Sequence, residues 1–302
     1  MTLAQLTYLI ALDNFRHFRK AATHCQVTQP SLSAQIRKLE EELGVILFDR
    51  EKKPTMPTPI GEQVIAQARI VLAEAAAIHD LLQSATGELA GTLRVGILPT
   101  LAPYLLPRLV SCFPKRYPNV TLVFEELRTP RIIELIKRDM LDVGLIATPI
   151  TSRGLVEQIL FDEPLVAYVS HGHRLWQRST LKPGDLVLNE VWLLGEGDDL
   201  RAQAVHLCGV RPPGATEQKA IQFESESLET LKRLVEQGQG MTLLPQLAVQ
   251  GEVPYQPALV KPFAAPTPMR TVRMVHARAL TKKHLAGALM DEIMEAVAPM
   301  SL

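Results

Sequence analysis

The pattern of apolar residues changes at Gly91, and this change is the strongest constraint on the fold of the chain. Beyond Gly91, short strand-like runs alternate with helical runs as far as a last predicted helix over 282–297. Such alternation is typical of an α/β fold, in which a parallel sheet carries helices on both faces. The predicted strands cover 93–97, 121–126, 143–147, 165–169, 191–194, 221–223, 241–244 and 272–275, and the predicted helices between them cover 104–117, 130–138, 200–208 and 228–236.

The α/β part, 91–302, is long for a single unit, because most domains have about 100–200 residues. We therefore expect two lobes, with the chain crossing from one to the other near Asp162 and returning near Pro266. Lobe I would comprise about 91–162 and 266–302, and lobe II about 163–265.

Residues 1–57 lack this alternation and are predicted to form a small head of three short helices followed by a two-stranded wing over 48–56. The third helix begins at Thr28 and stops at Gly44. Pro30 suits its first turn, where the missing N–H of proline is not needed. The head is thus predicted to be an all-α winged helix-turn-helix unit.

Residues 58–90 are predicted to form one long linker helix capped by Thr58. Apolar residues recur along it every three or four positions, the pattern of a seam that packs on another helix. We favour a seam between two copies of the chain, because the head looks too small to cover it. The alternative is an amphipathic helix that lies on its own domain. The seam residues are Ile60, Val64, Ala68, Val71, Ala75, Ile78 and Leu82.

Composition excludes several classes of protein. The 302 residues carry 32 basic and 32 acidic side chains, which argues against a protein that coats nucleic acid over its whole surface. We find no signal peptide and no run of about 18 or more uncharged apolar residues, which argues against export and membrane insertion. Cys25, Cys112 and Cys208 do not have the number or spacing of a disulfide framework or a zinc site. We expect a cytoplasmic protein without a metal or cofactor.

Basic residues are concentrated in one part of the head. Between Asn14 and Leu39 there are five arginines and lysines and no acidic residue, as a phosphate-binding face requires. The third helix opens with small and amide side chains that fit a major groove, and Gln29 is the best candidate for a bidentate base contact. Arg50 and Lys53 of the wing suit phosphate contacts. The candidate DNA-binding residues are Arg19, Thr28, Gln29, Pro30, Ser31, Ser33, Ala34, Arg37, Lys38, Arg50 and Lys53.

Taken alone, the basic residues would fit a solvated surface, and the small polar residues at the start of the third helix would fit ordinary helix caps. Their combination in a short helix-turn-helix with a basic wing favours binding to double-stranded DNA.

Several ungapped motifs give the chain a family resemblance. Four stretches of the first 61 residues resemble the signature of LysR-type transcriptional regulators, and four later stretches resemble the peroxide-sensing OxyR branch of that family. The first four are FRKAA at 18–22, VTQPSLS at 27–33, IRKLEEELGVILFDR at 36–50 and TPIG at 58–61. The later four are YLLP at 104–107, FDEP at 161–164, SLET at 227–230 and GMTLLP at 240–245.

The resemblance implies a regulatory domain like a periplasmic binding protein, with two α/β lobes and a cleft between them. It also implies a homotetramer, a dimer of dimers that pairs through linker helices and regulatory domains and places four heads on promoter DNA. A protein of this branch would be an activator in the oxidative stress response, with RNA polymerase as a candidate partner, and would not be an enzyme.

The sensing position departs from the OxyR pattern. In that branch a reactive cysteine follows Gly-His, and a resolving cysteine comes later in the chain. Here the corresponding stretch is GDDLR at 197–201, and Cys208 stands at the resolving position, nine residues after Asp199. Asp199 thus replaces the reactive thiol, and a carboxylate cannot form a sulfenic acid or a disulfide. Because Asp198 also departs from the pattern, natural divergence explains the pair better than a single engineered change.

The resemblance places the effector site in the cleft near Ala147. Threonine hydroxyls there would suit a small polar effector, and the carboxylates beside Gly197 would suit a cationic ligand or a divalent metal. A solvated acidic loop is the alternative reading, and a reaction of Cys208 alone through mixed disulfides is a third. The candidate effector-site residues are Thr100, Thr129, Asp198, Asp199, Arg201, Cys208 and Phe223.

Two other functions are alternatives to regulation: a thiol enzyme that uses Cys208, and a small-molecule-binding protein of the periplasmic type. The predicted DNA-binding head and the lack of a second catalytic cysteine or a Cys–His–carboxylate set argue against the enzyme, and the missing signal peptide argues against the binding protein. We therefore expect a regulator that resembles the hydrogen-peroxide-inducible activators, with effector control by a redox-insensitive or small-ligand route.

Overall fold

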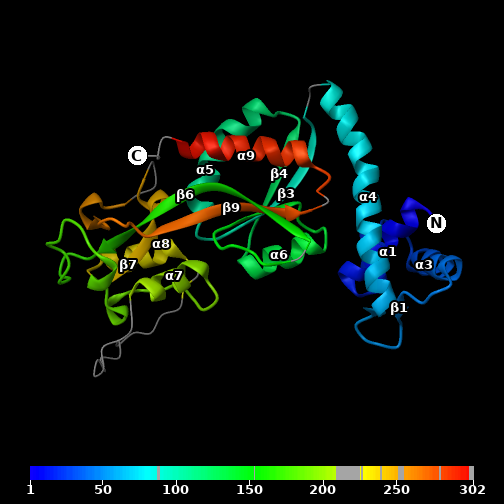
Figure 1. The fold of residues 1–302 in the computed structure, drawn as a ribbon, viewed down its shortest axis with the longest axis horizontal. Coiled ribbons are helices and arrows are strands. Elements are labelled where there is room, and N and C mark those ends of the chain that lie inside the picture. Colours follow the sequence, from blue (N-terminus) through cyan, green and yellow to red (C-terminus); the bar gives the residue numbers. More distant parts are fainter. Residues whose placement is uncertain are drawn as a thin grey trace.

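The head, the linker helix and the regulatory domain follow one another along an elongated molecule (Figure 1). This computed structural model describes residues 1–86, 89–152, 154–208, 225, 227–238, 240–250, 255–278 and 280–298.

The head has the predicted order of helices and wing. Its elements are α1 (Leu3–Phe15), α2 (Phe18–His24), α3 (Gln29–Leu43), β1 (Phe48–Asp49) and β2 (Met56–Pro57). Thr2 and Gln5 form a capping box at the start of α1, and Gly44 ends α3 in the left-handed region, with φ 68°. Leu9, Leu32 and Ile36 are fully buried in the core that joins α1 to α3.

The linker helix α4 (Pro59–Thr86) shares the core of the head. Ile65 and Ala68 are buried there, and Val64 and Val71 pack against the same cluster. The expectation that the head could not cover this helix is therefore wrong for the middle of the predicted seam. Two other seam residues stay open to solvent, since Ile60 is 42% exposed and Ile78 is 61% exposed.

Lobe I is built on a mixed sheet. Its parallel strands are β3 (Gly91–Ile97), β4 (Val120–Glu126) and β5 (Val143–Ile146), and its antiparallel strands are β9 (Met269–Ala277) and the first part of β6 (Leu155–Val169). The helices α5 (Ala102–Arg116) and α9 (Lys283–Val297) cover one face, and α6 (Thr129–Lys137) covers the other (Figure 1). The predicted parallel pairing is confirmed for β3, β4 and β5 and is wrong for β6 and β9, which are long antiparallel strands that return through the lobe.

Lobe II is smaller and less regular. It contains α7 (Asp199–Leu207), α8 (Leu228–Glu236), β7 (Met241–Pro245), β8 (Val260–Pro262) and the 3-10 turns Pro183–Asp185, Leu188–Glu190, Gln246–Val249 and Pro257–Leu259. The predicted strand at 191–194 is wrong, since Val191 and Leu194 form isolated bridges only. The predicted strand at 221–223 lies outside the described residues.

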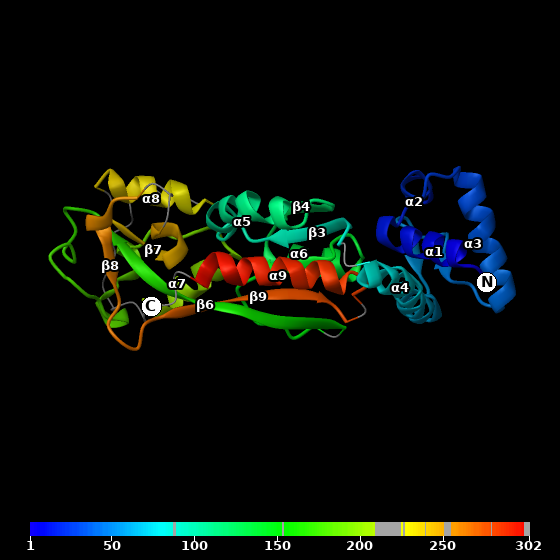
Figure 2. The same cartoon turned by 90° about the horizontal axis from the view of Figure 1, so that it is seen from above.

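One strand, β6, runs through both lobes (Figure 2). β6 pairs with β9 from Leu155 to Pro164 and then with β7 from Leu165 to Val169. Its first part therefore belongs to the sheet of lobe I and its last part to the sheet of lobe II. The predicted two-lobed α/β architecture is therefore confirmed. Among the described helices, none is both long and apolar enough to cross a membrane.

Candidate DNA-binding surface and regulatory site

The third helix of the head presents the face that the sequence predicts for DNA. The Thr28 side chain caps α3 by accepting a hydrogen bond from the Ser31 N–H at 3.3 Å. Leu32, Ile36 and Leu39 are buried, which turns the opposite side of α3 outward. The exposed candidates are Thr28, Gln29, Pro30, Ser31, Ala34, Arg37 and Lys38, while Ser33 is half-buried.

The two basic wing candidates differ in their surroundings. Arg50 donates a hydrogen bond from Nη2 to Oε2 of Glu40 at 2.6 Å, and its guanidinium lies over the ring of Phe18. The other carboxylate oxygen of Glu40 accepts the Leu47 N–H at 2.8 Å, so Glu40 ties α3 to the start of the wing. Lys53 is exposed at the wing tip. Arg50 thus has a structural contact that the sequence did not suggest, whereas Lys53 is presented to solvent.

An open groove of about 660 Å³ lies beside α2 and was not predicted from the sequence. No acidic side chain is among the residues that line it, and Arg19 and Lys20 extend the basic character of the head beyond α3. The lining residues are Phe15, His17, Arg19, Lys20, Thr23 and His24.

In the regulatory domain, Asp199 joins the two lobes. Its Oδ2 atom accepts hydrogen bonds from the Thr129 hydroxyl at 2.7 Å and from the Thr148 hydroxyl at 3.0 Å. Thr129 is the first residue of α6 and Thr148 follows β5, both in lobe I, whereas Asp199 is the first residue of α7 in lobe II. Two helix N-termini therefore meet at one carboxylate, an arrangement that favours negative charge.

Asp198 has a different partner set from Asp199. Its side chain caps α7, with Oδ1 accepting the N–H groups of Leu200 at 2.8 Å and Arg201 at 3.3 Å. Burial, and to a smaller extent the Asp199 charge, raises the pKa of Asp198, although the two backbone N–H bonds oppose this shift. The two neighbouring carboxylates thus bind separate donors and do not converge as metal ligands. No cluster of three or more metal-binding side chains occurs in the described parts of the chain.

The loop before α7 is held against lobe I by Arg128, whose Nη1 donates to the carbonyl oxygen of Glu196 at 2.7 Å. Gly197 has φ 81°, in the left-handed region that glycine adopts without strain. Arg201 turns back into its own lobe and donates to the carbonyl oxygen of Leu194 at 2.6 Å. Arg201 is therefore not a counter-charge for Asp199.

Cys208 lies at the far end of α7 from Asp199. It is 8% exposed and packs in the apolar core of lobe II, and burial raises its pKa to about 11. The nine residues between the two positions correspond to about 13.5 Å along a helix, well beyond the roughly 7 Å limit for Cα atoms of a disulfide. The structure thus separates Cys208 from the sensing position as well as burying its thiol.

Thr100 does not join Asp199. It is 3% exposed and lies against Arg270, whose Nη1 atom is 3.4 Å from the Thr100 hydroxyl. Nε of Arg270 also donates to Glu163 at 2.6 Å, and both of these charged side chains are buried. Of the predicted effector-site residues that the structure describes, only Thr129 and Asp199 bind each other. Asp198 and Arg201 lie beside Asp199 in the chain but have other partners, Thr100 and Cys208 lie elsewhere, and Phe223 is outside the described residues. The sequence missed Thr148, for which no local motif exists.

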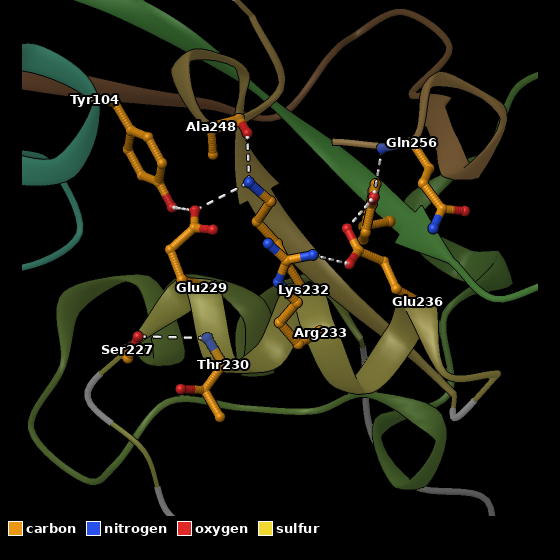
Figure 3. A network of polar contacts seen from close by, with 10 residues as sticks. Tyr104, Ser227, Glu229, Thr230, Lys232, Arg233, Glu236, Ala248 and Gln256 are labelled. Atoms are coloured by element: carbon orange, nitrogen blue, oxygen red, sulfur yellow. Dashed lines mark hydrogen bonds and ion pairs between the residues drawn. The ribbon is translucent and has the colours of Figure 1, made fainter. Parts of the chain in front are cut away.

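A second polar contact ties the lobes beside α8, as Figure 3 shows. The Tyr104 hydroxyl on α5 donates to Oε1 of Glu229 on α8 at 2.9 Å, and the same oxygen accepts from Lys232 at 2.9 Å. Lys232, which is buried, also donates to the carbonyl oxygen of Ala248 at 3.1 Å, so its ammonium bridges α8 and the Gln246–Val249 turn. Burial, with the neighbouring Glu229 charge, raises the pKa of Tyr104.

Comparison with known proteins agrees with both halves of the structure. The model for the bacterial regulatory helix-turn-helix protein, lysR family, matches residues 3–62, and the model for the LysR substrate binding domain matches residues 86–298. The hydrogen peroxide-inducible genes activator of Haemophilus influenzae is 34% identical over 297 residues, which cover 97% of each chain. The DNA-binding transcriptional dual regulator OxyR of Escherichia coli K12 is 36% identical over 276 residues, covering 91% of this chain and 89% of that protein.

The chain is also similar to a solved structure over nearly its whole length. This is a full-length OxyR from Pseudomonas aeruginosa that carries a cysteine-to-aspartate substitution, with a TM-score of 0.80 and 35% identity, covering 97% of this chain and 94% of that one. The relatives named here are transcriptional regulators and not enzymes. On the two family models, these relatives and this structure, the chain belongs to the LysR family of transcriptional regulators and is similar to its OxyR members.

Proposed function

We propose that this LysR-type regulator acts in the cytoplasm on promoter DNA and that its regulatory domain is not switched by an intramolecular disulfide. The observation that carries the second part is the pair of threonine hydroxyls that bind the Asp199 carboxylate. A carboxylate cannot be oxidised as a thiol is, and Cys208 is buried at the other end of α7. These two facts support control by a redox-insensitive route.

The DNA-binding part of the proposal rests on the head. Its recognition helix offers Gln29 and small polar side chains, and basic groups flank them on α2 and at the wing tip. Relatives named as activators of hydrogen peroxide-inducible genes support action at promoters. The proposal includes, as the family resemblance implies, a dimer of dimers on the DNA and RNA polymerase as a candidate partner.

Control by a small ligand in the cleft is the second candidate, and the conformation described here supports it less. Both hydroxyls predicted for a ligand are engaged within the protein, Thr100 against Arg270 and Thr129 on Asp199. A ligand that bound these hydroxyls would have to share them with these contacts.

Peroxide treatment of the full-length protein tests the redox part. We would measure free thiols, intact mass and the DNase footprint on DNA upstream of its own gene, with an OxyR that keeps its cysteine pair as the positive control. The proposal expects all three readouts to stay unchanged at peroxide levels that shift the control. Oxidation of Cys208 together with a shifted footprint would show that the protein is a one-cysteine redox sensor.

A gel-shift assay on the same DNA tests the head. Gln29→Ala is expected to weaken binding by about 5- to 150-fold, the effect of losing a bidentate base contact of about 1–3 kcal/mol. Gln63→Ala on the exposed side of α4 is the matched control and should bind as the wild type does. Equal binding by both variants would remove the assignment of α3 as the recognition helix.

A further inference from the structure

One guanidinium connects all three parts of the chain. Arg69 lies on α4, and its Nη2 donates to Asp13 at 2.9 Å and to Asn14 at 2.8 Å, both on α1 of the head. Its Nη1 donates to Asp139 of the regulatory domain. The Arg69 side chain is 17% exposed, so this contact is largely shielded from solvent. We call these four residues the Arg69 junction.

We propose that the Arg69 junction fixes the orientation of the DNA-binding head relative to the regulatory domain. Arginine suits this position because its planar fork directs donors from two terminal nitrogens to acceptors on two different domains. Lysine has a single nitrogen, so it would hold the acceptors of both domains less well than the two terminal nitrogens of arginine do. Without Arg69, the Asp13 and Asp139 carboxylates would face each other with less counter-charge, and their repulsion would favour separation of head and regulatory domain.

The junction lies at one end of α6, and Asp199 lies at the other. Thr129, which binds Asp199, is the first residue of α6, and Asp139 comes directly after its C-terminal cap at Arg138. In Figure 1, α6 lies between α7 of lobe II and the linker helix α4. A helix of nine residues is about 13.5 Å long, so a tilt of α6 caused at Thr129 moves Asp139 at the other end.

The packing of α6 leaves little freedom to absorb such a tilt locally. Ile132, Leu135 and Ile136 are buried against the sheet. A Cβ atom added at Gly144 on β5 would lie 2.2 Å from Cγ2 of Ile132, which shows how closely the helix approaches the strand. Asp139 has φ 54°, a conformation that Asp and Asn tolerate better than most residues, and it forms the turn that leads from α6 to β5.

This inference rests on the proposed function, because it gives the route by which the state of the Asp199 site reaches DNA. It assigns Arg69 a positioning role: the residue needs no contact with DNA or with an effector. The test must therefore change a residue in one domain and measure the response in the other. A purely local structural role would give no response there.

Hydrogen exchange on the full-length protein without DNA gives the first test. Asp139→Ala, a change in the regulatory domain, is expected to accelerate exchange about tenfold in the head peptide around 10–16, the factor for one lost charged hydrogen bond. Arg69→Ala should do the same for that peptide and for the one around 137–142, and Arg69→Lys should be intermediate. The matched control is Arg131→Ala, which removes an ion pair with Glu134 on α6 but no contact to the head.

If Asp139→Ala leaves exchange in the head peptide at the wild-type rate, the junction does not hold the head and the proposal is overturned. If every variant, including Arg131→Ala, exchanges faster throughout the chain, the cause is general destabilisation. That result would also overturn the proposal.

Footprinting on DNA upstream of its own gene tests the route through α6. Asp199→Ala should change footprint length in the wild-type background and have no further effect in the Arg69→Ala background, because the two sites share one path. An equal change in both backgrounds, or no change in either, would contradict the route. These measurements use no peroxide, so their failure is distinct from a failure of the redox-insensitive proposal, which would appear as a peroxide-dependent footprint of the wild type.

Discussion

The Asp199 carboxylate accepts a hydrogen bond from the Thr129 hydroxyl at 2.7 Å, and this bond joins α7 of lobe II to α6 of lobe I. Position 199 is where the family resemblance expects a reactive thiol. A thiol is a weak hydrogen-bond partner, whereas a carboxylate oxygen accepts two charge-assisted bonds, here from Thr129 and Thr148. The position has therefore taken on a role as a contact between the lobes.

Removing either hydroxyl should loosen that contact. We expect Thr129→Val and Thr148→Val each to lower the free energy of unfolding of the regulatory domain by about 1–2 kcal/mol, since each deletes one bond to a charged acceptor. Denaturant unfolding of the full-length protein would measure it. Thr271→Val, which deletes an exposed bond to Asp162 of similar length, is the control and should change stability by less than about 0.5 kcal/mol. Equal losses in all three variants would contradict a special role for Asp199.

The acid dependence of stability should respond to Asp198. Folding raises the pKa of the Asp198 carboxyl above its ordinary value of 3.8, so the folded protein binds a proton at this carboxyl more readily than the unfolded chain does. The contribution of Asp198 to stability therefore falls as pH rises above 3.8. Asp198→Asn keeps the helix cap and removes the charge. We expect the variant to melt at a higher temperature than the wild type near neutral pH, with the difference shrinking towards pH 3.8. A constant difference at every pH would mean that ionisation of Asp198 is not its cause.

Cys208 should be slow to react in the folded protein. With its pKa raised to about 11, only about one thiol in 10⁴ is ionised at neutral pH, and the side chain is 8% exposed. Iodoacetamide labelling followed by peptide mass spectrometry should show full modification of Cys208 in urea and little without it. Rapid labelling of the native protein would instead revive the mixed-disulfide hypothesis.

Local signals in the sequence were sufficient for much of the fold. The cap at Thr58, the start of α3 at Thr28, the stop at Gly44 and the helix over 228–236 each depend on neighbouring residues, and the structure has these features where they were predicted. Strand direction is different, because it depends on how the chain returns. The spacing of apolar residues in β6 and β9 is the same for parallel and antiparallel pairing, so the mixed sheet could not be deduced.

In the candidate sites too, the residues with a local motif could be predicted and those brought together by folding could not. Asp199 and Cys208 were found from a motif, whereas Thr148, 51 residues before Asp199, became a partner only through folding. Arg69 and Asp139 are 70 residues apart and belong to different domains, and neither carries a motif. Arg50 shows the converse: its basic character suggested a phosphate contact, but the sequence could not reveal that Glu40 already binds it.

Substitutions in the wing should distinguish a residue that contacts phosphate from one that holds the wing in place. Lys53→Ala should weaken DNA binding and reduce the slope of log K against log salt by about 0.9, the effect of one lost phosphate contact, without changing thermal stability. Arg50→Ala should instead lower the stability of the head by about 1 kcal/mol, because it breaks the bond that Glu40 makes to the wing. Salt titrations of affinity and melting curves for both variants would measure this. The reverse pattern would make Arg50 the phosphate contact.

The buried pair of Glu163 and Arg270 should be the most sensitive polar contact of the regulatory domain. Glu163 on β6 is paired with Arg270 on β9, next to the place where the chain crosses between the lobes. Both side chains are 3% exposed or less. Glu163 also accepts the Leu247 N–H at 2.7 Å, and Arg270 reaches Thr100.

Arg270→Met leaves the Glu163 charge buried with too few partners, so we expect a loss of about 3–5 kcal/mol, measured by denaturant unfolding. Replacing both residues, as Glu163→Leu with Arg270→Met, removes the unpaired charge and should recover most of that loss, since apolar side chains of similar volume often substitute well for a buried ion pair. If the double variant is as unstable as the sum of the single ones, the two side chains do not compensate each other. The bonds to Leu247 and Thr100 would then be what holds the lobes at this crossing.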